Sequence, residues 1–132
     1  MLVVDASIAI YAINHEQGFA TLEDRELVAP ALMWSETRSV LHAKRWRREL
    51  ADDDAEILRR RLESSPVRLV HRARLGDEAW RLADELGWAK TYDAEYLAVA
   101  SLLGCRLVTL DGKLRRGADR LGLVVSPEEL NA

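Results

Sequence analysis

Short apolar runs alternate with longer stretches of helical periodicity along this chain of 132 residues. The runs are rich in valine and leucine, which fit the buried surface of a sheet, so we expect each to form a strand. They lie at residues 2–4, 27–29, 67–70, 106–110 and 123–125. Strands that alternate with helices build a mainly parallel sheet with helices against its faces. The sequence therefore predicts a single α/β domain over residues 1–132, with a central sheet of about four to five strands.

Between these runs, apolar residues recur at the spacing of a helix. It predicts helices at residues 7–14, 31–49, 50–65, 76–86 and 91–103. Gly87 and Gly104 follow the last two, at the position where a left-handed residue commonly ends a helix. Three consecutive acids, Asp52 to Asp54, open the third helix. We interpret them as partners of the helix dipole, because consecutive residues of a helix point in different directions.

The composition is that of an ordinary folded protein. Hydrophobic residues make up 48% of the chain and charged residues 31%, which does not indicate disorder. No apolar run approaches the length of a membrane span, and no basic region precedes the apolar start, so we expect no membrane segment. The single cysteine, Cys105, excludes an internal disulfide and suits the reducing cytoplasm, where we place the protein.

The charge pattern allows two interpretations. A net charge of −3 argues against a generally basic coat for nucleic acid. The basic residues are nearly all arginines, however, and they gather at residues 44–48, 59–61 and 68–74 and at Lys113 with Arg115 and Arg116. Such groups suit a phosphate-binding rim around an acidic pocket, and they equally suit solvated faces of helices.

Asp5 follows the first predicted strand directly, and Ser7 comes two residues later. In a parallel α/β sheet, ligands bind beyond the carboxyl ends of the strands, so Asp5 would stand at the ligand-binding edge. The alternative is that Asp5 or Ser7 caps the helix that begins here. Asp5 alone does not decide between the two.

Two further acids occupy comparable positions. Asp111 follows the strand predicted at residues 106–110, and Asp93 stands at the expected N-cap of the helix at residues 91–103. Each has an ordinary alternative, because Asp-Gly is a common turn pair and aspartate is a common cap. Connections in α/β folds gather strand ends and helix starts on one edge of the sheet, so both acids are expected near Asp5.

Glu36 is the fourth acid, and it falls on an apolar stripe of its predicted helix, in line with Leu32 and Val40. A buried carboxylate is costly unless it is paired or binds a metal ion. The alternatives are that Glu36 reaches solvent along its own side chain or pairs with Arg38.

Several carboxylates in one pocket repel one another, and hard divalent cations relieve that repulsion. Mg²⁺ favours oxygen ligands, and paired ions activate water for the hydrolysis of phosphodiesters. His15, His42 and His71 have no metal-ligand spacing, which disfavours zinc. The sequence has no glycine loop that would cradle phosphates, which disfavours nucleoside triphosphate chemistry.

Four segments together carry a family resemblance. They are Asp5-Ala6-Ser7, Trp34-Ser35-Glu36, Thr91-Tyr92-Asp93-Ala94 and Leu107-Val108-Thr109-Leu110-Asp111. With these segments, which are spread over nearly the whole chain, the sequence resembles a PIN-domain ribonuclease, and more closely a VapC-type toxin of a bacterial toxin–antitoxin pair. The resemblance implies a Mg²⁺-dependent endoribonuclease, with Mn²⁺ as a substitute. It also implies a homodimer and an inhibitory VapB-type antitoxin encoded beside it.

The same resemblance implies roles for individual residues. The catalytic, metal-binding acids would be Asp5, Glu36, Asp93 and Asp111. Ser7 and Thr109 would be hydroxyls that orient carboxylates or water, and Asp111 would act directly or through water. We leave Glu95 out of the site, because two residues beyond Asp93 on a helix it should point elsewhere.

Contacts to RNA are assigned from residue type. We expect Arg45 and Arg116 to meet RNA phosphates near the rim of the site. One of Trp34, Trp46 and Trp88 would stack on a splayed base, although packing in the core or in a dimer is the commoner use of tryptophan.

Two other functions stay open. A catalytically inactive PIN-like module would hold RNA or a protein partner without cutting, and the presence of all four acids argues against it. A metal-dependent phosphohydrolase for small phosphate esters usually has an aspartate nucleophile with a second acid two residues later. Ser7 occupies that position here, which argues against this second alternative.

Overall fold

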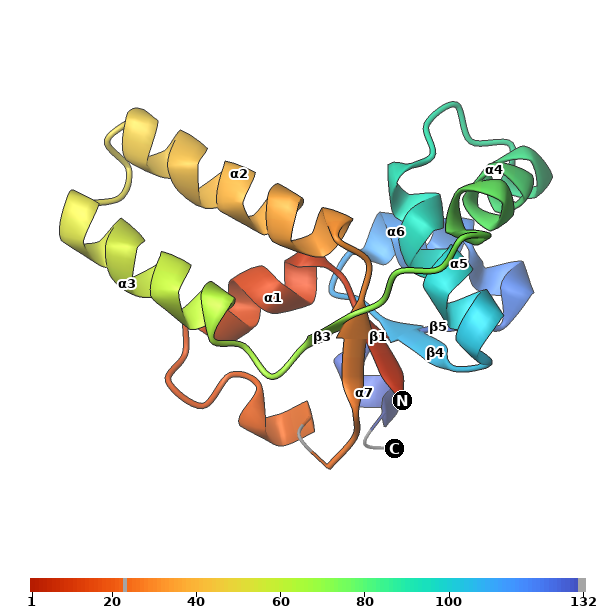
Figure 1. Ribbon diagram of the computed structural model, residues 1–132, viewed down its shortest axis with the longest axis horizontal. Coiled ribbons are helices and arrows are strands. Elements are labelled where there is room, and N and C mark those ends of the chain that lie inside the picture. The colour runs from red at the N-terminus through yellow and green to blue at the C-terminus, as the bar shows by residue number, and fades with distance from the viewer. Residues whose placement is uncertain (23, 131–132) are drawn as a thin grey trace.

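Five strands form one parallel sheet at the centre of the molecule (Figure 1). The computed structural model describes residues 1–22 and 24–130. The strands are β1 (Leu2–Val4), β2 (Leu27–Ala29), β3 (Arg68–Leu69), β4 (Arg106–Val108) and β5 (Val124–Val125). They pair in the order β3-β2-β1-β4-β5, and every pair is parallel. The α/β class and the parallel sheet expected from the sequence are therefore confirmed.

Helices connect the strands. In the described residues they are α1 (Ala6–Ile13), α2 (Leu32–Trp46), α3 (Asp52–Glu63), α4 (Leu75–Leu86), α5 (Tyr92–Leu103), α6 (Gly112–Gly117) and α7 (Pro127–Leu130), with short 3₁₀ turns at Ala20–Leu22 and Asp119–Leu121. The five longer helices are the predicted ones. The sequence does not predict α6 and α7, because helices of six and four residues are too short for an apolar period to show. None of the helices in the described residues combines the length and the hydropathy that crossing a membrane requires.

Several predicted elements end earlier than expected. The helix expected at residues 31–49 stops at Trp46, and the next, expected from residue 50, starts at Asp52. Between them Arg48 has a left-handed backbone with φ 60°, a conformation that a right-handed helix cannot contain. The strands expected at residues 67–70 and 106–110 are also shorter, since the chain turns away after one more backbone hydrogen bond at each carboxyl end.

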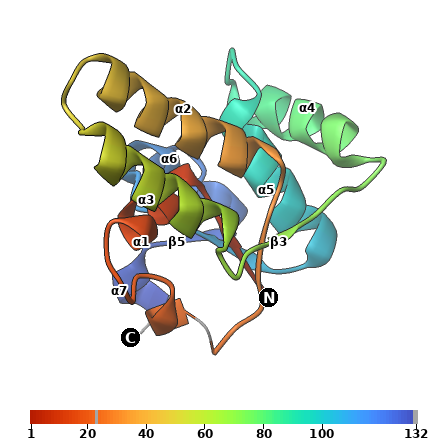
Figure 2. The same ribbon diagram turned by 60° about the vertical axis from the view of Figure 1, so that its left-hand side comes forward.

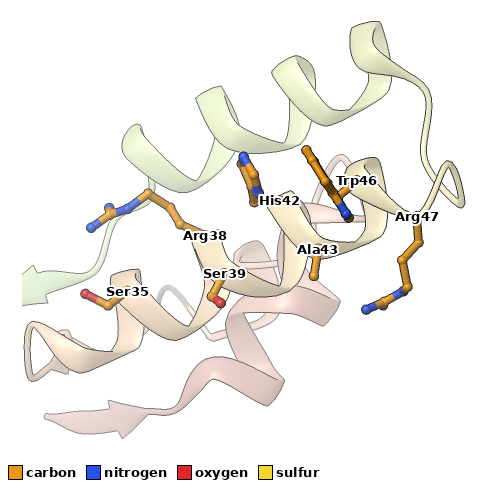
Figure 3. Close-up of a pocket in the computed structure, with 7 residues that line it drawn as sticks. All are labelled: Ser35, Arg38, Ser39, His42, Ala43, Trp46 and Arg47. Carbon is orange, nitrogen blue, oxygen red and sulfur yellow. The ribbon is translucent and has the colours of Figure 1, made fainter.

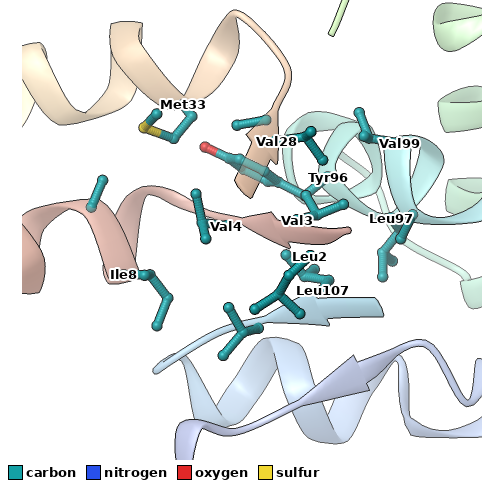
Figure 4. Packing of buried hydrophobic residues seen from close by; sticks show 14 of the residues in the cluster. Leu2, Val3, Val4, Ile8, Val28, Met33, Tyr96, Leu97, Val99 and Leu107 are labelled. Atoms are coloured by element: carbon teal, nitrogen blue, oxygen red, sulfur yellow. The ribbon is translucent and has the colours of Figure 1, made fainter. Parts of the chain in front are cut away.

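The core lies between the sheet and α5. The central strand β1 is fully buried, with Val3 and Val4 completely shielded from solvent. Tyr96 and Leu97 of α5 lie among the strand side chains (Figure 4). On its other side α5 packs against α4, whereas α1, α2 and α3 pack on one another at the opposite end of the molecule (Figure 2). The sheet thus lies between two groups of helices.

One edge of the sheet collects the positions that the sequence singled out. Val4 at the end of β1 pairs with Val108 at the end of β4, so the chain leaves both strands at neighbouring points. Asp5 follows the first of them and Thr109 the second. Because the strands are parallel, these carboxyl ends share the edge where α/β folds commonly bind ligands.

Candidate active site

Asp5 is buried at the carboxyl end of β1, where its side chain caps α1 and accepts two further hydrogen bonds. Its residue is 4% exposed. Oδ1 accepts a hydrogen bond from the backbone N–H of Ile8 at 3.1 Å, which makes Asp5 the N-cap of α1. Ser7 Oγ also donates to Oδ1, at 2.6 Å, and Thr109 Oγ1 donates to Oδ2. A cap needs only the first of these bonds, and the two hydroxyls satisfy further acceptor positions of the buried carboxylate and fix its orientation.

The two hydroxyls also join the turn after β1 to the turn after β4. Ser7 Oγ lies 3.3 Å from Thr109 Oγ1 and accepts a hydrogen bond from the backbone N–H of Leu110 at 3.0 Å. Thr109 Oγ1 accepts one from the backbone N–H of Asp111 at 3.0 Å. The hydroxyls expected to orient carboxylates therefore contact Asp5 directly and hold the backbone of Asp111 beside it.

Asp111 is the N-cap of α6 rather than part of an Asp-Gly turn. Its Oδ1 accepts hydrogen bonds from the backbone N–H groups of Lys113 and Leu114, at 2.9 and 3.2 Å. Its Oδ2 has no hydrogen-bond partner among the described residues. One carboxylate oxygen of Asp111 thus caps α6, and the other is not hydrogen-bonded to a described residue.

Glu36 is half-buried on α2 and is held by a tyrosine that the sequence did not single out. The hydroxyl of Tyr96 donates to Glu36 Oε1 at 2.7 Å, and Tyr96 is only 1% exposed. The backbone N–H of Ala6 hydrogen-bonds the same phenolic oxygen. The alternative partner, Arg38, pairs with Glu63 at 3.2 Å. Glu36 is therefore tied to the start of α1, immediately after Asp5, through the buried tyrosine.

Asp93 is not the N-cap of its helix, contrary to the prediction. Thr91 occupies that position, and Asp93 lies in the first turn of α5. Aspartate suits either position, so the sequence could not separate them. As a result the Asp93 carboxylate makes no hydrogen bond or ion pair with the described residues. A carboxylate that no cap requires is available to a ligand.

Burial and the charges of neighbouring acids raise the pKa values of Asp5 and Glu36. Burial raises the pKa of Asp5, the hydrogen bonds from Ser7 and Thr109 oppose this, and the charge of Asp111 raises the pKa further. Burial also raises the pKa of Glu36, and although the Tyr96 hydrogen bond lowers it, the charges of Asp93 and Asp5 raise it. Asp5 and Glu36 are thus each less stable as anions because of neighbouring acids.

The same balance holds for Asp93, whose pKa is raised by burial and then by the charges of Asp111 and Asp5, while Lys113 opposes the rise. Glu95, which we expected to point away, lies close enough to Glu36 for its charge to raise the pKa of that residue. We left Glu95 out of the site because helical spacing gives its direction relative to Asp93 but not its distance from α2.

Three of the acids border one open pocket of about 680 Å³. Its lining consists of Glu36, Gly87, Trp88, Ala89, Lys90, Tyr92, Asp93, Asp111, Lys113 and Leu114. Two lysines and an exposed tyrosine are thus present beside the acids. Lys113 belongs to the basic group with Arg115 and Arg116, and Tyr92 lies in one of the four segments of the family resemblance, but neither was assigned a role. Lys90 is isolated in sequence.

The donor chemistry of this edge fits a hard divalent cation. All the candidate ligands are carboxylate oxygens, their charges raise one another's pKa values, and Glu36, Asp93 and Asp111 each have at least one carboxylate oxygen without a hydrogen bond to a described residue. Within residues 1–22 and 24–130, however, no three acidic, histidine or cysteine side chains stand close enough together to hold one ion. The acids are gathered at one edge without forming a closed ligand cage.

The two arginines expected to contact RNA phosphates do not line the pocket of the acids. Arg45 lines a separate hollow between α2 and α3, and Arg116 packs beside Gly112. Trp88 packs against Gly117, and Trp34 against the core.

Trp46 is 80% exposed and lies in a hollow on the outer face of α2, at the opposite end from Ser35 (Figure 3). No acidic side chain lines this hollow. Of the three tryptophans Trp46 is the exposed one and lies away from the pocket of the acids, whereas Trp88 is half-buried and lines that pocket.

Comparison with known proteins identifies the family. The model of the PIN domain matches residues 2–120, a span that contains all four acids. The chain belongs to the PIN domain family. Curated relatives that align with this PIN domain over 118 residues at 35% identity are VapC ribonuclease Mb0985 of Mycobacterium bovis and Ribonuclease VapC9 of Mycobacterium tuberculosis. The alignments cover 86% of this chain and 88% of each relative, which groups the chain with the VapC proteins.

Solved structures agree with this placement. PAE2754 from Pyrobaculum aerophilum superposes with a TM-score of 0.75 at 26% identity, over 98% of this PIN domain and 90% of that chain. VapC20 of Mycobacterium tuberculosis, a toxin that cleaves the sarcin-ricin loop, superposes with a TM-score of 0.61 over 88% of this chain and 94% of its own. Its sequence identity is 19%, so this second likeness concerns the fold alone.

Proposed function

We propose that this PIN domain is a metal-dependent endoribonuclease that acts as the toxin of a toxin–antitoxin pair. It hydrolyses RNA phosphodiester bonds and thereby inhibits translation or growth when its antitoxin is absent. The observation that carries the proposal is the burial of Asp5 under two donated hydroxyl hydrogen bonds, next to three further acids at one sheet edge. The relatives named as VapC ribonucleases support the same activity.

The cofactor in this proposal is Mg²⁺, with Mn²⁺ as a substitute, held by Asp5, Glu36, Asp93 and Asp111. When bound, such ions lower the pKa of a water molecule and stabilise charge on the leaving oxygen. The chain's own contribution is positioning. Ser7 and Thr109 fix both oxygens of Asp5, while Tyr96 fixes one oxygen of Glu36.

The remaining partners are part of the proposal as well. The VapC relatives suggest a VapB-type antitoxin, a homodimer and a cytoplasmic location for this chain. Arg45 and Arg116 remain candidates for phosphate contacts outside the pocket of the acids.

The decisive experiment is cleavage of total RNA by the purified chain with Mg²⁺, with Mn²⁺ and with a chelator. We expect cleavage that needs the metal and that is lost in Asp5→Asn and in Asp93→Asn. The matched control is Asp53→Asn, which removes an exposed acid from the start of α3. Cleavage that persists in both active-site variants would refute the assignment of the acids.

The competing function, an inactive module that binds RNA or protein, makes a different prediction. Calorimetric titration of such a module with Mn²⁺ would show no site that disappears in Asp93→Asn. Sequencing of cellular RNA 5′ ends after brief induction of the chain would identify the RNA that is cut. Turnover of a generic phosphate monoester would instead favour a phosphohydrolase.

A further inference from the structure

The wall of the acidic pocket is built by the loop between α4 and α5 together with the start of α6. Gly87, which ends α4 in a left-handed conformation with φ 72°, turns the chain into this loop. Trp88 is half-buried and its ring contacts Gly117, where an added Cβ would lie 3.4 Å from the ring. Trp88 thus fastens the loop to α6, which gives the residues after it a fixed place at the rim.

Two lysines stand on this wall beside the acids. Lys90 comes from the loop and Lys113 from α6, and both side chains are exposed. Neither forms an ion pair with a described residue, although Lys113 is near enough to Asp93 to influence its charge. Many of the arginines elsewhere, such as Arg59 and Arg115, pair with neighbouring carboxylates. The two lysines therefore keep their positive charge available beside a site rich in negative charge.

An exposed aromatic ring completes this wall. Tyr92 immediately precedes Asp93, lines the pocket and is 58% exposed. Flat aromatic rings stack on unpaired nucleobases in complexes with single-stranded nucleic acids, and Tyr92 offers such a ring at the rim of the acidic pocket. The ring, the two ammonium groups and the acids all border the same pocket.

We propose that Lys90, Lys113 and Tyr92 form a subsite for single-stranded RNA beside the bond that is cleaved. The lysines bind the phosphates that flank the scissile one, and Tyr92 stacks on an unpaired base next to it. This inference rests on the proposed ribonuclease function and adds to it the residues that hold the substrate next to the cleaved bond. A base held in a duplex offers no free face for Tyr92, so the subsite selects unpaired RNA.

The test is RNA binding by a chain that cannot cleave. We place Lys90→Ala, Lys113→Ala and Tyr92→Ala separately in the Asp5→Asn background and measure fluorescence anisotropy of a labelled single-stranded oligouridylate against salt. Each lysine variant is expected to bind several-fold more weakly and to lower the salt slope by about 0.7, the value for one lost phosphate contact on a single strand. Tyr92→Ala should weaken binding about tenfold with an unchanged slope, and Tyr92→Phe should restore it.

Matched controls are Lys44→Ala and Tyr11→Ala, which remove an exposed lysine and a 53% exposed tyrosine that do not line this pocket. If the subsite variants bind like these controls while the parent binds RNA, the subsite is refuted and the ribonuclease proposal stands. If the parent binds no RNA, both are refuted. Equal binding of a duplex of the same length would refute the stacking role of Tyr92.

Discussion

The hydroxyl of Tyr96 donates a hydrogen bond of 2.7 Å to Glu36 Oε1, across 60 residues of sequence. It joins the middle of α5 to the first turns of α2, and the backbone N–H of Ala6 bonds the same phenolic oxygen. Asp93 lies three residues before Tyr96 on α5, and Asp5 directly precedes Ala6. One buried side chain thus connects the segments that carry three of the four acids.

Replacing this tyrosine tests that connection. Tyr96→Phe keeps the ring in the core but leaves Glu36 without its donor, so we expect a loss of about 1 kcal/mol in the free energy of unfolding. We also expect weaker binding of Mn²⁺ by calorimetry, because Glu36 is no longer held toward the other acids. Tyr11→Phe, which alters an exposed hydroxyl, is the control. Unchanged Mn²⁺ affinity in Tyr96→Phe would contradict the positioning role.

The raised pKa of Asp5 predicts how stability depends on pH in the absence of metal. An acid whose pKa is higher in the folded than in the unfolded state binds a proton more tightly when folded. Its contribution therefore favours folding below the ordinary value of 3.8 and is lost as pH rises through the raised pKa of the folded state. Other carboxylates also titrate, so the measurement is the difference in thermal stability between wild type and Asp5→Asn across pH. We expect the wild type to lose stability relative to the variant as pH rises through this range.

Divalent metal should reverse that pH effect by neutralising the acids. At a concentration one hundred times its dissociation constant, a ligand stabilises the folded state by about 2.7 kcal/mol. We expect Mg²⁺ and Mn²⁺ to raise the melting temperature of the wild type but not of Asp93→Asn. Asp77→Asn, an exposed acid on α4, should respond like the wild type. An equal metal response in all three proteins would place the ion elsewhere.

The two hydroxyls around Asp5 predict a shift in the pH profile of RNA cleavage. Their hydrogen bonds lower the pKa of Asp5 against the effect of burial, so removing one raises that pKa further. Thr109→Val should move the acidic limb of the pH–rate profile to higher pH, and Ser7→Ala should do the same. Thr109→Ser retains the hydroxyl and should keep the wild-type limb. Identical limbs in Thr109→Val and Thr109→Ser would show that the bond does not control Asp5.

Gly18 provides a prediction about the fold alone. A Cβ at this position would lie 2.1 Å from the backbone oxygen of Ala12, in rigid helical backbone, so Gly18→Ala forces the loop away from α1. We expect a loss of several kcal/mol, about the size of a severe core substitution, by urea denaturation. Gly76→Ala, in α4 with open space around the same atom, is expected to be neutral or stabilising.

Much of the architecture follows from local patterns, because each buried strand is a continuous apolar run and each long helix has a clear period. The position of Asp5 at a strand end was predictable for the same reason. Tyr96 was not, since a tyrosine in an apolar helix shows only that it packs, and its hydroxyl's partner lies on another helix. The predicted N-cap of α5 was wrong, because both threonine and aspartate are good caps and Thr91 takes the position expected for Asp93.

The lysines of the pocket wall illustrate a second limit. Lys90 is isolated in sequence, and Lys113 belongs to the basic group of Arg115 and Arg116, of which Arg116 was the residue expected to meet RNA. Whether a cation lies near a pocket depends on how loops pack, as Trp88 packs on Gly117, and no local pattern encodes that.

The parallel pairing of β1 with β4 also has a consequence for the chain as it is synthesised. Asp5 is among the first residues to leave the ribosome, but Thr109 and Asp111, which complete its surroundings, come more than a hundred residues later. Until β4 has docked beside β1, the carboxylate lacks one of its two hydroxyl partners and the charge of Asp111, which follows β4 and raises its pKa. The site is therefore assembled last, when nearly the whole chain is available, and a prematurely terminated chain retains Asp5 without the environment that gives it a function.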